Sequence, residues 1–320
     1  MTALLYQDPE LAALAPRLHD ADATVRRIAV LDLADLDGDA HLPLLIEALG
    51  DSAAVVRAEA ARALEAFESP RSVAALAQLL ADPDEDVRGA AAQSLSELKQ
   101  PASAAQLIPF IGSSDSFVRA AALRGVRELR APASFAPAQD ALHDQDALVR
   151  REAVAVLGYL KHEGALPALT RIVESDPAPE VRRAAASALG FADSPAVLSA
   201  LLAALADAAW PVREEAATTL GKLRLQGAAP ALIAALEDPY WQVRLRAARS
   251  LGRLRSAQAL PALLVALEHA ISNLRKEAAL ALGEIGSPLA LGALEQAAGD
   301  PDPEVRKSVR LAIGQIGAAA

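Results

Sequence analysis

The sequence predicts an all-α fold, an α-solenoid of about ten two-helix repeats of 31 residues. The first observation behind this prediction is an arginine, usually preceded by valine, that recurs every 31 residues, with one step of 32 between Arg150 and Arg182. The second is a composition of 53% apolar but only 3% aromatic residues, which favours helices packed through small side chains. A fixed period of this length is typical of solenoids. The ten arginines are Arg26, Arg57, Arg88, Arg119, Arg150, Arg182, Arg213, Arg244, Arg275 and Arg306.

The composition excludes several classes of site. The chain has no cysteine, which excludes disulfides and thiolate metal ligands on this chain. No apolar run reaches the length of a membrane span, and the N-terminal stretch MTALLYQDPELAAL lacks the basic region of a secretory signal. We therefore expect a soluble cytoplasmic protein with no membrane partner.

The net charge of −10 arises in one half of the chain. Residues 1–150 carry 23 acids and 13 bases, which gives −10, whereas residues 151–320 carry 18 of each, which gives zero. An acidic protein is a poor general binder of phosphate backbones. Nucleic acid is therefore not an expected partner, although the second half leaves room for a local basic patch.

The second helix of each repeat, here called helix B, is predicted to begin about three residues before the arginine. Counting that arginine as zero, apolar residues recur at −1, +3, +7 and +10, which is one face of a helix. In the eighth repeat these residues are Val243, Ala247, Leu251 and Leu254.

Glycine at +8 of helix B marks the more regular repeats. The six repeats from Arg150 onward all carry it, and a missing side chain would let the neighbouring repeat approach closely. The first four repeats have other residues there. We therefore predict one solenoid over residues 1–320, with less regular repeats over 1–130 and regular repeats over 131–320. The six glycines are Gly158, Gly190, Gly221, Gly252, Gly283 and Gly314.

The first helix, helix A, is predicted to follow a short turn. Proline leads it in several repeats, as Pro261 does in LPALLVALEH, because the first turn of a helix does not need the missing N–H. An aspartate at −6 then belongs to the turn between helix A and helix B. It occurs in eight of the ten repeats, and Ser113 and His269 replace it in the other two.

This pattern of aspartate, arginine and a helix ending in LGxIG resembles HEAT repeats, most closely the short HEAT-like type of phycobilisome bilin lyases and many bacterial relatives. The resemblance covers essentially the whole chain. It implies that the arginines and aspartates form a ladder along the turns and that the B helices line a concave face. We interpret these residues as structural. They are Asp20, Arg26, Asp51, Arg57, Asp82, Arg88, Asp144, Arg150, Asp176, Arg182, Asp207, Arg213, Asp238, Arg244, Asp300 and Arg306.

Two columns of helix B depart from the repeat, the +9 column on its predicted open face and the −3 column at the mouth of the helix. The +9 column changes from acidic to aromatic to basic along the chain, and the −3 column holds both tryptophans in adjacent repeats. Aromatic rings supply contact area and arginines bind carboxylates and other anions. The alternative is that the tryptophans pack within the fold and the arginines only solvate a helix. The candidate patch is Tyr159, Phe191, Trp210, Lys222, Tyr240, Trp241, Arg246, Arg249 and Arg253.

No motif for catalysis or metal binding stands out. None of the five histidines lies three or four residues from another, so no helix presents a histidine pair to a metal. Neither GxxxxGK[ST] nor GxSxG occurs. We expect no metal, no cofactor and no catalytic residue. A non-enzymatic protein is favoured, while a serine with an ordered His–Asp partner stays open.

Three functions remain in competition. The leading hypothesis is a scaffold or adaptor that binds a protein partner through the concave face. The resemblance suggests an alternative, a bilin lyase subunit or chromophore-handling chaperone, whose aromatics stack on a tetrapyrrole and whose arginines pair with its propionates. A small anionic ligand or bilin is then the partner. A third hypothesis, a relative of the HEAT-like alkylpurine DNA glycosylases, fits an acidic chain poorly.

Overall fold

The computed structural model describes residues 9–36, 40–192 and 194–319, which form twenty α-helices and no strand. The prediction of an all-α fold is confirmed. The B helices are α3 (Ala23–Ala34), α5 (Ala54–Ala63), α7 (Glu85–Ser96), α9 (Ser116–Arg127), α11 (Ala147–Leu160), α13 (Pro179–Ala188), α15 (Trp210–Lys222), α17 (Trp241–Leu254), α19 (Ser272–Ile285) and α21 (Pro303–Ala319).

The A helices are shorter and alternate with the B helices along the chain. They are α2 (Pro9–Leu14), α4 (Leu42–Ala48), α6 (Pro70–Gln78), α8 (Ala104–Leu107), α10 (Phe135–Ala141), α12 (Leu166–Ser175), α14 (Leu198–Leu205), α16 (Ala229–Ala234), α18 (Leu260–Leu267) and α20 (Leu291–Ala297). Short 3₁₀ turns flank them. These are η1 (Arg17–His19), η2 (Leu64–Ala66), η3 (Leu79–Ala81), η4 (Pro101–Ser103), η5 (Ile108–Gly112), η6 (Pro132–Ser134), η7 (Glu163–Ala165), η8 (Leu189–Phe191), η9 (Pro195–Val197), η10 (Gln226–Ala228), η11 (Ala235–Glu237), η12 (Ala257–Ala259) and η13 (Pro288–Ala290).

Contacts divide the chain into two compact units, residues Met1–Leu160 and Lys161–Ala320. We call them the first and the second unit and describe each by itself. The division follows α11, within the stretch of regular repeats.

Every B helix begins three residues before its arginine, as the proline positions predicted. Trp210 and Trp241 are therefore the first residues of α15 and α17. At the other end, α17 and α19 are closed by residues in the left-handed conformation, Arg255 at φ 51° and Gly286 at φ 73°. This places the −3 column at one end of the B helices and the +9 column at the opposite end.

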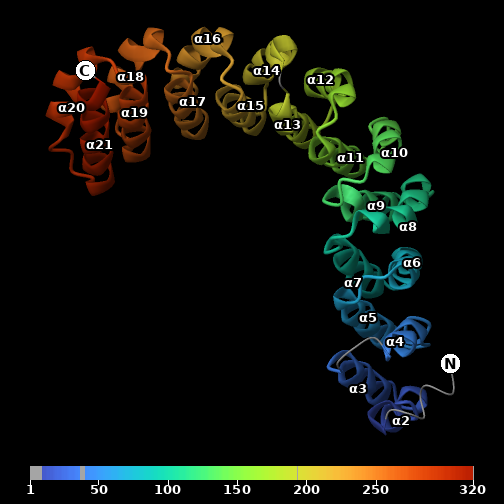
Figure 1. Cartoon of the computed structure of the whole chain (residues 1–320). Coiled ribbons are helices and arrows are strands. Elements are labelled where there is room, and N and C mark those ends of the chain that lie inside the picture. Colours follow the sequence, from blue (N-terminus) through green and yellow to red (C-terminus); the bar gives the residue numbers. More distant parts are fainter. Residues whose placement is uncertain (1–8, 37–39, 193, 320) are drawn as a thin grey trace. The chain divides into compact units, whose positions relative to one another are not determined.

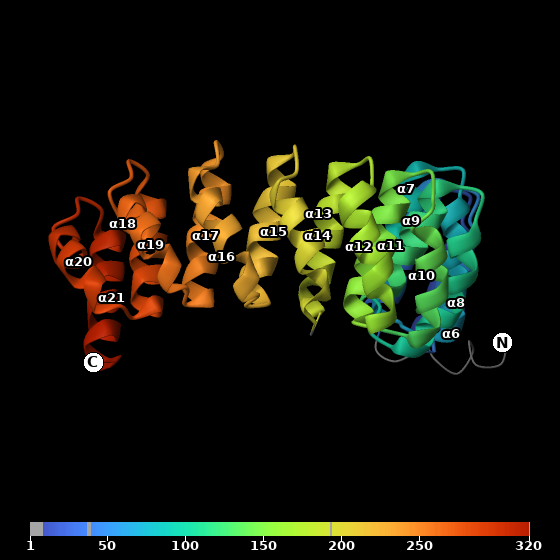
Figure 2. The same cartoon turned by 90° about the horizontal axis from the view of Figure 1, so that it is seen from above.

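Within each unit the helices form two layers (Figure 1). In the second unit the A helices α14, α16 and α18 make one layer, and the B helices α15, α17 and α19 make the other. Figure 2 shows α15, α17 and α19 running side by side. The predicted apolar face of α17 points into the core between the layers, since Val243, Leu251 and Leu254 are at most 2% exposed. Below, the term B-helix face means the side of the B layer that faces away from the A helices. It includes both ends of the B helices.

Glycine at +8 lies where neighbouring B helices approach most closely. A Cβ on Gly252 would lie 2.8 Å from the Cα of Ala281 in α19, and a Cβ on Gly283 would lie 2.7 Å from the Cα of Ala312 in α21. Side-chain atoms essentially never come so close. Gly314 of the last repeat, in contrast, has nothing within 4 Å of such a Cβ. Gly221, Gly252 and Gly283 thus permit the close spacing of the B helices that follow them.

Candidate functional site: the turn ladder and the B-helix face

A ladder of ion pairs runs along the turns that precede the B helices. Six arginines donate Nε to Oδ2 of an aspartate in the next repeat at 2.6–2.8 Å and Nη2 to Oδ1 at 2.7–3.0 Å. Such two-pronged pairing is the strong form of an arginine–carboxylate bond. The six pairs are Arg26–Asp51, Arg57–Asp82, Arg119–Asp144, Arg182–Asp207, Arg213–Asp238 and Arg275–Asp300.

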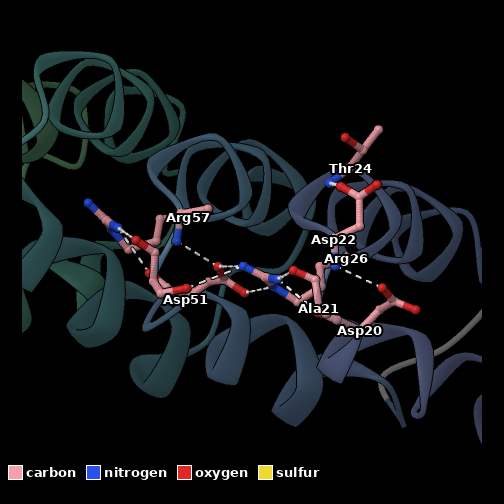
Figure 3. A network of polar contacts seen from close by, with 9 residues as sticks. Asp20, Ala21, Asp22, Thr24, Arg26, Asp51 and Arg57 are labelled. Carbon is pink, nitrogen blue, oxygen red and sulfur yellow. Dashed lines mark hydrogen bonds and ion pairs between the residues drawn. The ribbon is translucent and has the colours of Figure 1, made fainter.

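Each of these arginines also closes its own turn. In the first repeat, Nη1 of Arg26 donates to the carbonyl oxygens of Asp20 and Ala21 at 2.8 and 3.2 Å (Figure 3). The aspartate in turn accepts the backbone N–H two residues onward, as Asp51 does from Ala53 at 2.7 Å. A single aspartate therefore shapes its turn and joins two repeats.

The ion pair also acts on the acidity of the aspartate. The hydrogen bonds from the Arg26 guanidinium lower the pKa of Asp51 more than its burial raises it, and the N–H of Ala53 lowers it further. The same guanidinium–carboxylate bonding raises the pKa of Arg26. Both groups are therefore held in their charged forms, and the pair joins the two repeats as an ion pair.

Four ladder residues at the ends of the row or of a unit also bond to the backbone of their own turns. Arg306 in the last repeat donates Nη1 to the carbonyl oxygens of Asp300 and Pro301. Arg150 does the same with Asp144 and Gln145. Asp20 accepts the N–H of Asp22 and shapes the first turn. Asp176, at the start of the second unit, accepts the N–H of Ala178 at 2.9 Å.

The ladder is broken where serine or histidine replaces the aspartate. Ser113 Oγ and His269 Nδ1 each still accept the backbone N–H two residues onward, at 3.2 and 3.0 Å. Neither side chain is a carboxylate, so the arginine of the preceding repeat has lost its partner. Arg88 keeps its two carbonyl contacts and lies over the ring of Phe117, with Cζ 5.6 Å from the ring centroid. Arg244 has none of the ladder's contacts among the described residues.

A second row of ion pairs, which the sequence analysis missed, crosses the B-helix face. Glutamates at +2 receive arginines from the neighbouring B helix. Arg249 at +5 donates Nε to Oε2 of Glu277 at 2.9 Å and Nη2 to Oε1, and Glu277 is only 3% exposed. Arg124 at +5 pairs in the same register with buried Glu152 in the first unit. The signal was present in the sequence as glutamate at +2 in four repeats, namely Glu59, Glu152, Glu215 and Glu277.

Ion pairs between B helices decide what two of the candidate arginines do, Arg249 within this second row and Arg246 with Glu214 at +1. Arg246 donates Nε to Oε1 of Glu214 at 3.0 Å, and Arg249 binds Glu277 through Nε and Nη2 together. The Glu277 carboxylate raises the pKa of the Arg249 guanidinium against the effect of burial. Both guanidinium groups are therefore used within the fold. The depression beside them, about 160 Å³, is lined by Arg249, Arg253, Glu277, Leu280, Ala281 and Glu284.

The rarest side chains of the sequence gather at the N-terminal ends of α15 and α17. Trp210 stacks on Tyr240, with ring centroids 5.5 Å apart and planes at 16°. Arg213, while bound to Asp238, also lies over the Tyr240 ring at 5.6 Å. Tyr240 and Trp241 remain 45% and 41% exposed, whereas Trp210 is half-buried. The partner of Trp210 in the next repeat is thus Tyr240. Trp210, Tyr240 and Trp241 are called the aromatic cluster below.

The remaining candidate residues lie away from this cluster. Lys222 and Arg253 are exposed near the C-terminal ends of α15 and α17. Arg253 lies twelve residues after Trp241 in α17, which at 1.5 Å per residue is about 18 Å. Phe191 is half-buried at the end of η8, and Tyr159 belongs to the first unit, where Arg127 lies over its ring at 5.7 Å. The second unit therefore places its candidate residues at two ends of the B helices.

Neither a metal site nor a membrane span is found in the part of the chain that the structure describes. No three His, Asp or Glu side chains there come together in a group that could hold a metal ion. None of the described helices combines the length and the apolar content that crossing a membrane requires.

Comparison with known proteins identifies the repeat. The family model of HEAT repeats matches the chain at residues 11–96, 73–147, 135–221, 171–241 and 229–314. A search of the curated proteins found no significant match. Among solved structures, an engineered protein is 21% identical with a TM-score of 0.53, and the match covers 97% of this chain and 99% of that one.

Two further structures resemble the chain. One is a structure of Kap95p binding to RanGDP, which induces the switch loops of RanGDP to adopt the GTP-bound conformation. A chain in it is 15% identical with a TM-score of 0.68 over 98% of this chain, which spans about half, 51%, of that chain's length. The complex of CpcE and CpcF of phycocyanin lyase from Nostoc is 24% identical over 67% of this chain and 94% of that one, with a TM-score of 0.45. Identities this low show a shared fold alone, and the last TM-score supports no argument about function.

Proposed function

The chain belongs to the HEAT-repeat family, and we propose that it is a non-enzymatic scaffold or adaptor that binds a protein partner through its B-helix face. One observation carries the proposal. The aromatic cluster exposes Tyr240 and Trp241 beside each other in a chain with only 3% aromatic residues. Exposed aromatic side chains of this kind are typical anchors of protein interfaces, where tyrosine and tryptophan supply much of the binding energy.

Rigid support favours the aromatic cluster as an anchor. Tyr240 is held between the Trp210 ring and the Arg213 guanidinium, and Arg213 is itself fixed by Asp238. Side chains that are already ordered lose less conformational entropy when a partner binds. The scaffold thus presents a preformed surface at the edge of the B helices.

The experiment is affinity capture from the cell of origin with matched variants. We expect Trp241→Ala to lose the captured partner, because truncation of an aromatic anchor typically costs about 2 kcal/mol or more of binding. Its melting temperature should change little, since Trp241 is 41% exposed. Val265→Ala is the control, because Val265 is 68% exposed but lies on α18 in the A layer. Equal capture by Trp241→Ala and Val265→Ala would contradict the proposal.

The bilin alternative has less support from the side chains. Arginines that pair with propionates must have guanidinium groups to offer, and Arg246 and Arg249 each bind a glutamate of a neighbouring helix. Absorbance of the protein after incubation with a bilin separates the two functions. A new visible band that survives gel filtration would favour the alternative, and its absence together with partner capture would favour the scaffold.

A further inference from the structure

The turn that joins Arg244 to the ninth repeat differs from all six complete rungs of the ladder. In a rung the arginine donates Nε and Nη2 to a carboxylate and Nη1 to two carbonyl oxygens. Arg244 makes none of these bonds within the described part of the chain, and its Nε is buried with no hydrogen-bond partner. A buried donor left without an acceptor is costly, so such groups are normally satisfied in the functional state of a protein.

His269 stands where the other repeats have the carboxylate. Its Nδ1 accepts the N–H of Ile271 at 3.0 Å, as an aspartate oxygen does elsewhere. Because Nδ1 accepts, the proton of the neutral imidazole is on Nε2, which is then a donor. Arg244 and His269 therefore bring donors to this turn, and the carboxylate that would accept from them is missing.

The other broken rung shows that a missing aspartate alone does not produce this situation. Arg88 has Ser113 in place of the aspartate, yet its Nη1 still donates to Asp82 and Pro83, and its guanidinium lies over Phe117. Arg88 is occupied by its own unit. Arg244, in contrast, has a buried Nε without an acceptor among the described residues.

We propose that the turn of Arg244 and His269 binds a carboxylate from an acidic segment of a protein partner, in place of the missing ladder aspartate. The six rungs are the template, since in each of them the arginine at the same place in the repeat is bound by an aspartate from the next repeat. The inference rests on the proposed function and names the chemistry that the partner brings.

Two neighbouring features favour a peptide segment over a small free anion. Trp241 precedes Arg244 by three residues, so the two side chains emerge on the same side of α17, and Trp241 offers exposed apolar area for a residue beside the acidic one. The stretch between Asp238 and Glu268 contains no acid, so none of its side chains repels a negatively charged segment beside Arg244. The surface therefore matches an acidic residue flanked by an apolar one.

The test follows the Nε–H signals of the arginines by ¹⁵N NMR during titration with the peptide acetyl-Leu-Asp-Leu-amide. The Arg244 signal is assigned by its disappearance in Arg244→Gln. We expect a saturable shift of that signal, at lower concentration with the peptide than with sodium acetate or inorganic phosphate. The affinity of Arg244→Gln for the peptide, followed through the Trp241 indole signal, should be lower by up to about tenfold, because one charge-assisted hydrogen bond is lost.

His269→Asp is the decisive variant. It supplies the chain's own carboxylate at the ladder position, so the Arg244 signal should move in the free protein and no longer respond to the peptide. The Arg88 signal is the matched control and should stay unchanged. A response that persists in His269→Asp, or an equal response to acetate, phosphate and peptide, would overturn the proposal. So would an Arg244 signal that the peptide never moves.

Failure of this site and failure of the scaffold function give different results. Partner capture that depends on Trp241 but survives Arg244→Gln would remove the carboxylate site and leave the scaffold standing. A peptide response at Arg244 without any capture dependent on Trp241 would contradict the scaffold function and leave the carboxylate site standing.

Discussion

The arginine at position zero has the same identity in every repeat and three different roles. Arg213 forms a complete rung, Arg88 keeps its backbone bonds and lies over an aromatic ring, and Arg244 has no ladder contact among the described residues. The difference lies in the residue that the next repeat places opposite the guanidinium. At this scale a role belongs to a pair of residues 25 positions apart, such as Arg213 and Asp238.

Restoring a rung in the first unit should stabilise the protein. In Ser113→Asp the new carboxylate would face Arg88 and still accept the N–H of Asp115, as Ser113 does. A partly exposed bidentate pair contributes up to about 1 kcal/mol, so we expect a rise of a few degrees in melting temperature, measured by circular dichroism. Asp144→Ser, which removes the rung of Arg119, is the reverse experiment and should lower it. Equal melting temperatures for wild type and Ser113→Asp would count against the stabilising role of the rungs.

The rungs also make the fold sensitive to acid. The pKa of Asp144 is lowered by its bonds to Arg119, against burial, and that of Asp300 is lowered in the same way by Arg275. Because the folded pKa lies below the unfolded value of about 3.9, this stabilisation is complete above pH 4 to 5. It is lost as the pH falls through the folded pKa. Melting temperatures between pH 6 and pH 2 should therefore drop steeply at the acid end, and less steeply in a variant that carries Asp144→Asn and Asp300→Asn. An identical pH profile in that variant would show that other carboxylates control the acid transition.

At the scale of helices, the spacing of the B layer depends on glycine at +8. The Cα of Ala281 would lie 2.8 Å from a Cβ on Gly252, so α17 and α19 touch through backbone atoms. Glycine inside a helix normally costs about 1 kcal/mol relative to alanine. Close packing of the two helices is the physical compensation, since dispersion contacts grow with approach.

Two glycines of the same column should respond in opposite directions to substitution by alanine. Gly252→Ala should destabilise the second unit by about 1–3 kcal/mol, because the added methyl forces α17 and α19 apart. Gly314→Ala should be neutral or stabilising by up to about 1 kcal/mol, because nothing lies within 4 Å of the new Cβ and alanine favours the helix. Chemical denaturation of both variants measures the difference. The packing explanation is wrong if Gly252→Ala is as stable as Gly314→Ala.

At the scale of the molecule, the candidate surfaces of the second unit occupy opposite ends of its B helices. The aromatic cluster and the Arg244 turn lie at the N-terminal ends, while Lys222 and Arg253 lie near the C-terminal ends. A partner bound at the aromatic cluster can thus contact Arg244 without reaching Arg253. The two units each contain their own layers and core, which is typical of repeat proteins, where a repeat depends on its neighbours.

The second unit should therefore fold when it is separated from the first. We expect a fragment of residues 161–320 to keep its helical circular dichroism signal and to unfold cooperatively, because its repeats supply their own contacts. Its melting temperature should lie below that of the whole chain, since short arrays have fewer repeat interfaces. Gel filtration checks that the fragment is monomeric. A disordered fragment would show that the second unit needs the first in order to fold.

The repeat, the alternation of helices and the residue at which every B helix begins can all be predicted from the sequence. These follow from local chemistry repeated at a fixed period: the apolar face, the proline positions and the aspartate that closes each turn. The two residue types of the ladder also recur in every or nearly every repeat. The family assignment rests on the same pattern, and the match to HEAT repeats bears it out.

Which side chains remain available to bind a partner depends on how the helices pack. Arg246, Arg249 and Arg253 lie on one side of α17 in a helical projection, yet two of them bind glutamates of neighbouring helices and the third is exposed near the end of α17. Trp210 and Trp241 occupy the same column in adjacent repeats, yet the ring that stacks on Trp210 is that of Tyr240. The physical reason is that a contact between repeats joins side chains about 30 residues apart, whose distance and orientation are set by helix packing. A column of the sequence shows what each repeat offers, and the neighbouring repeat determines what remains exposed.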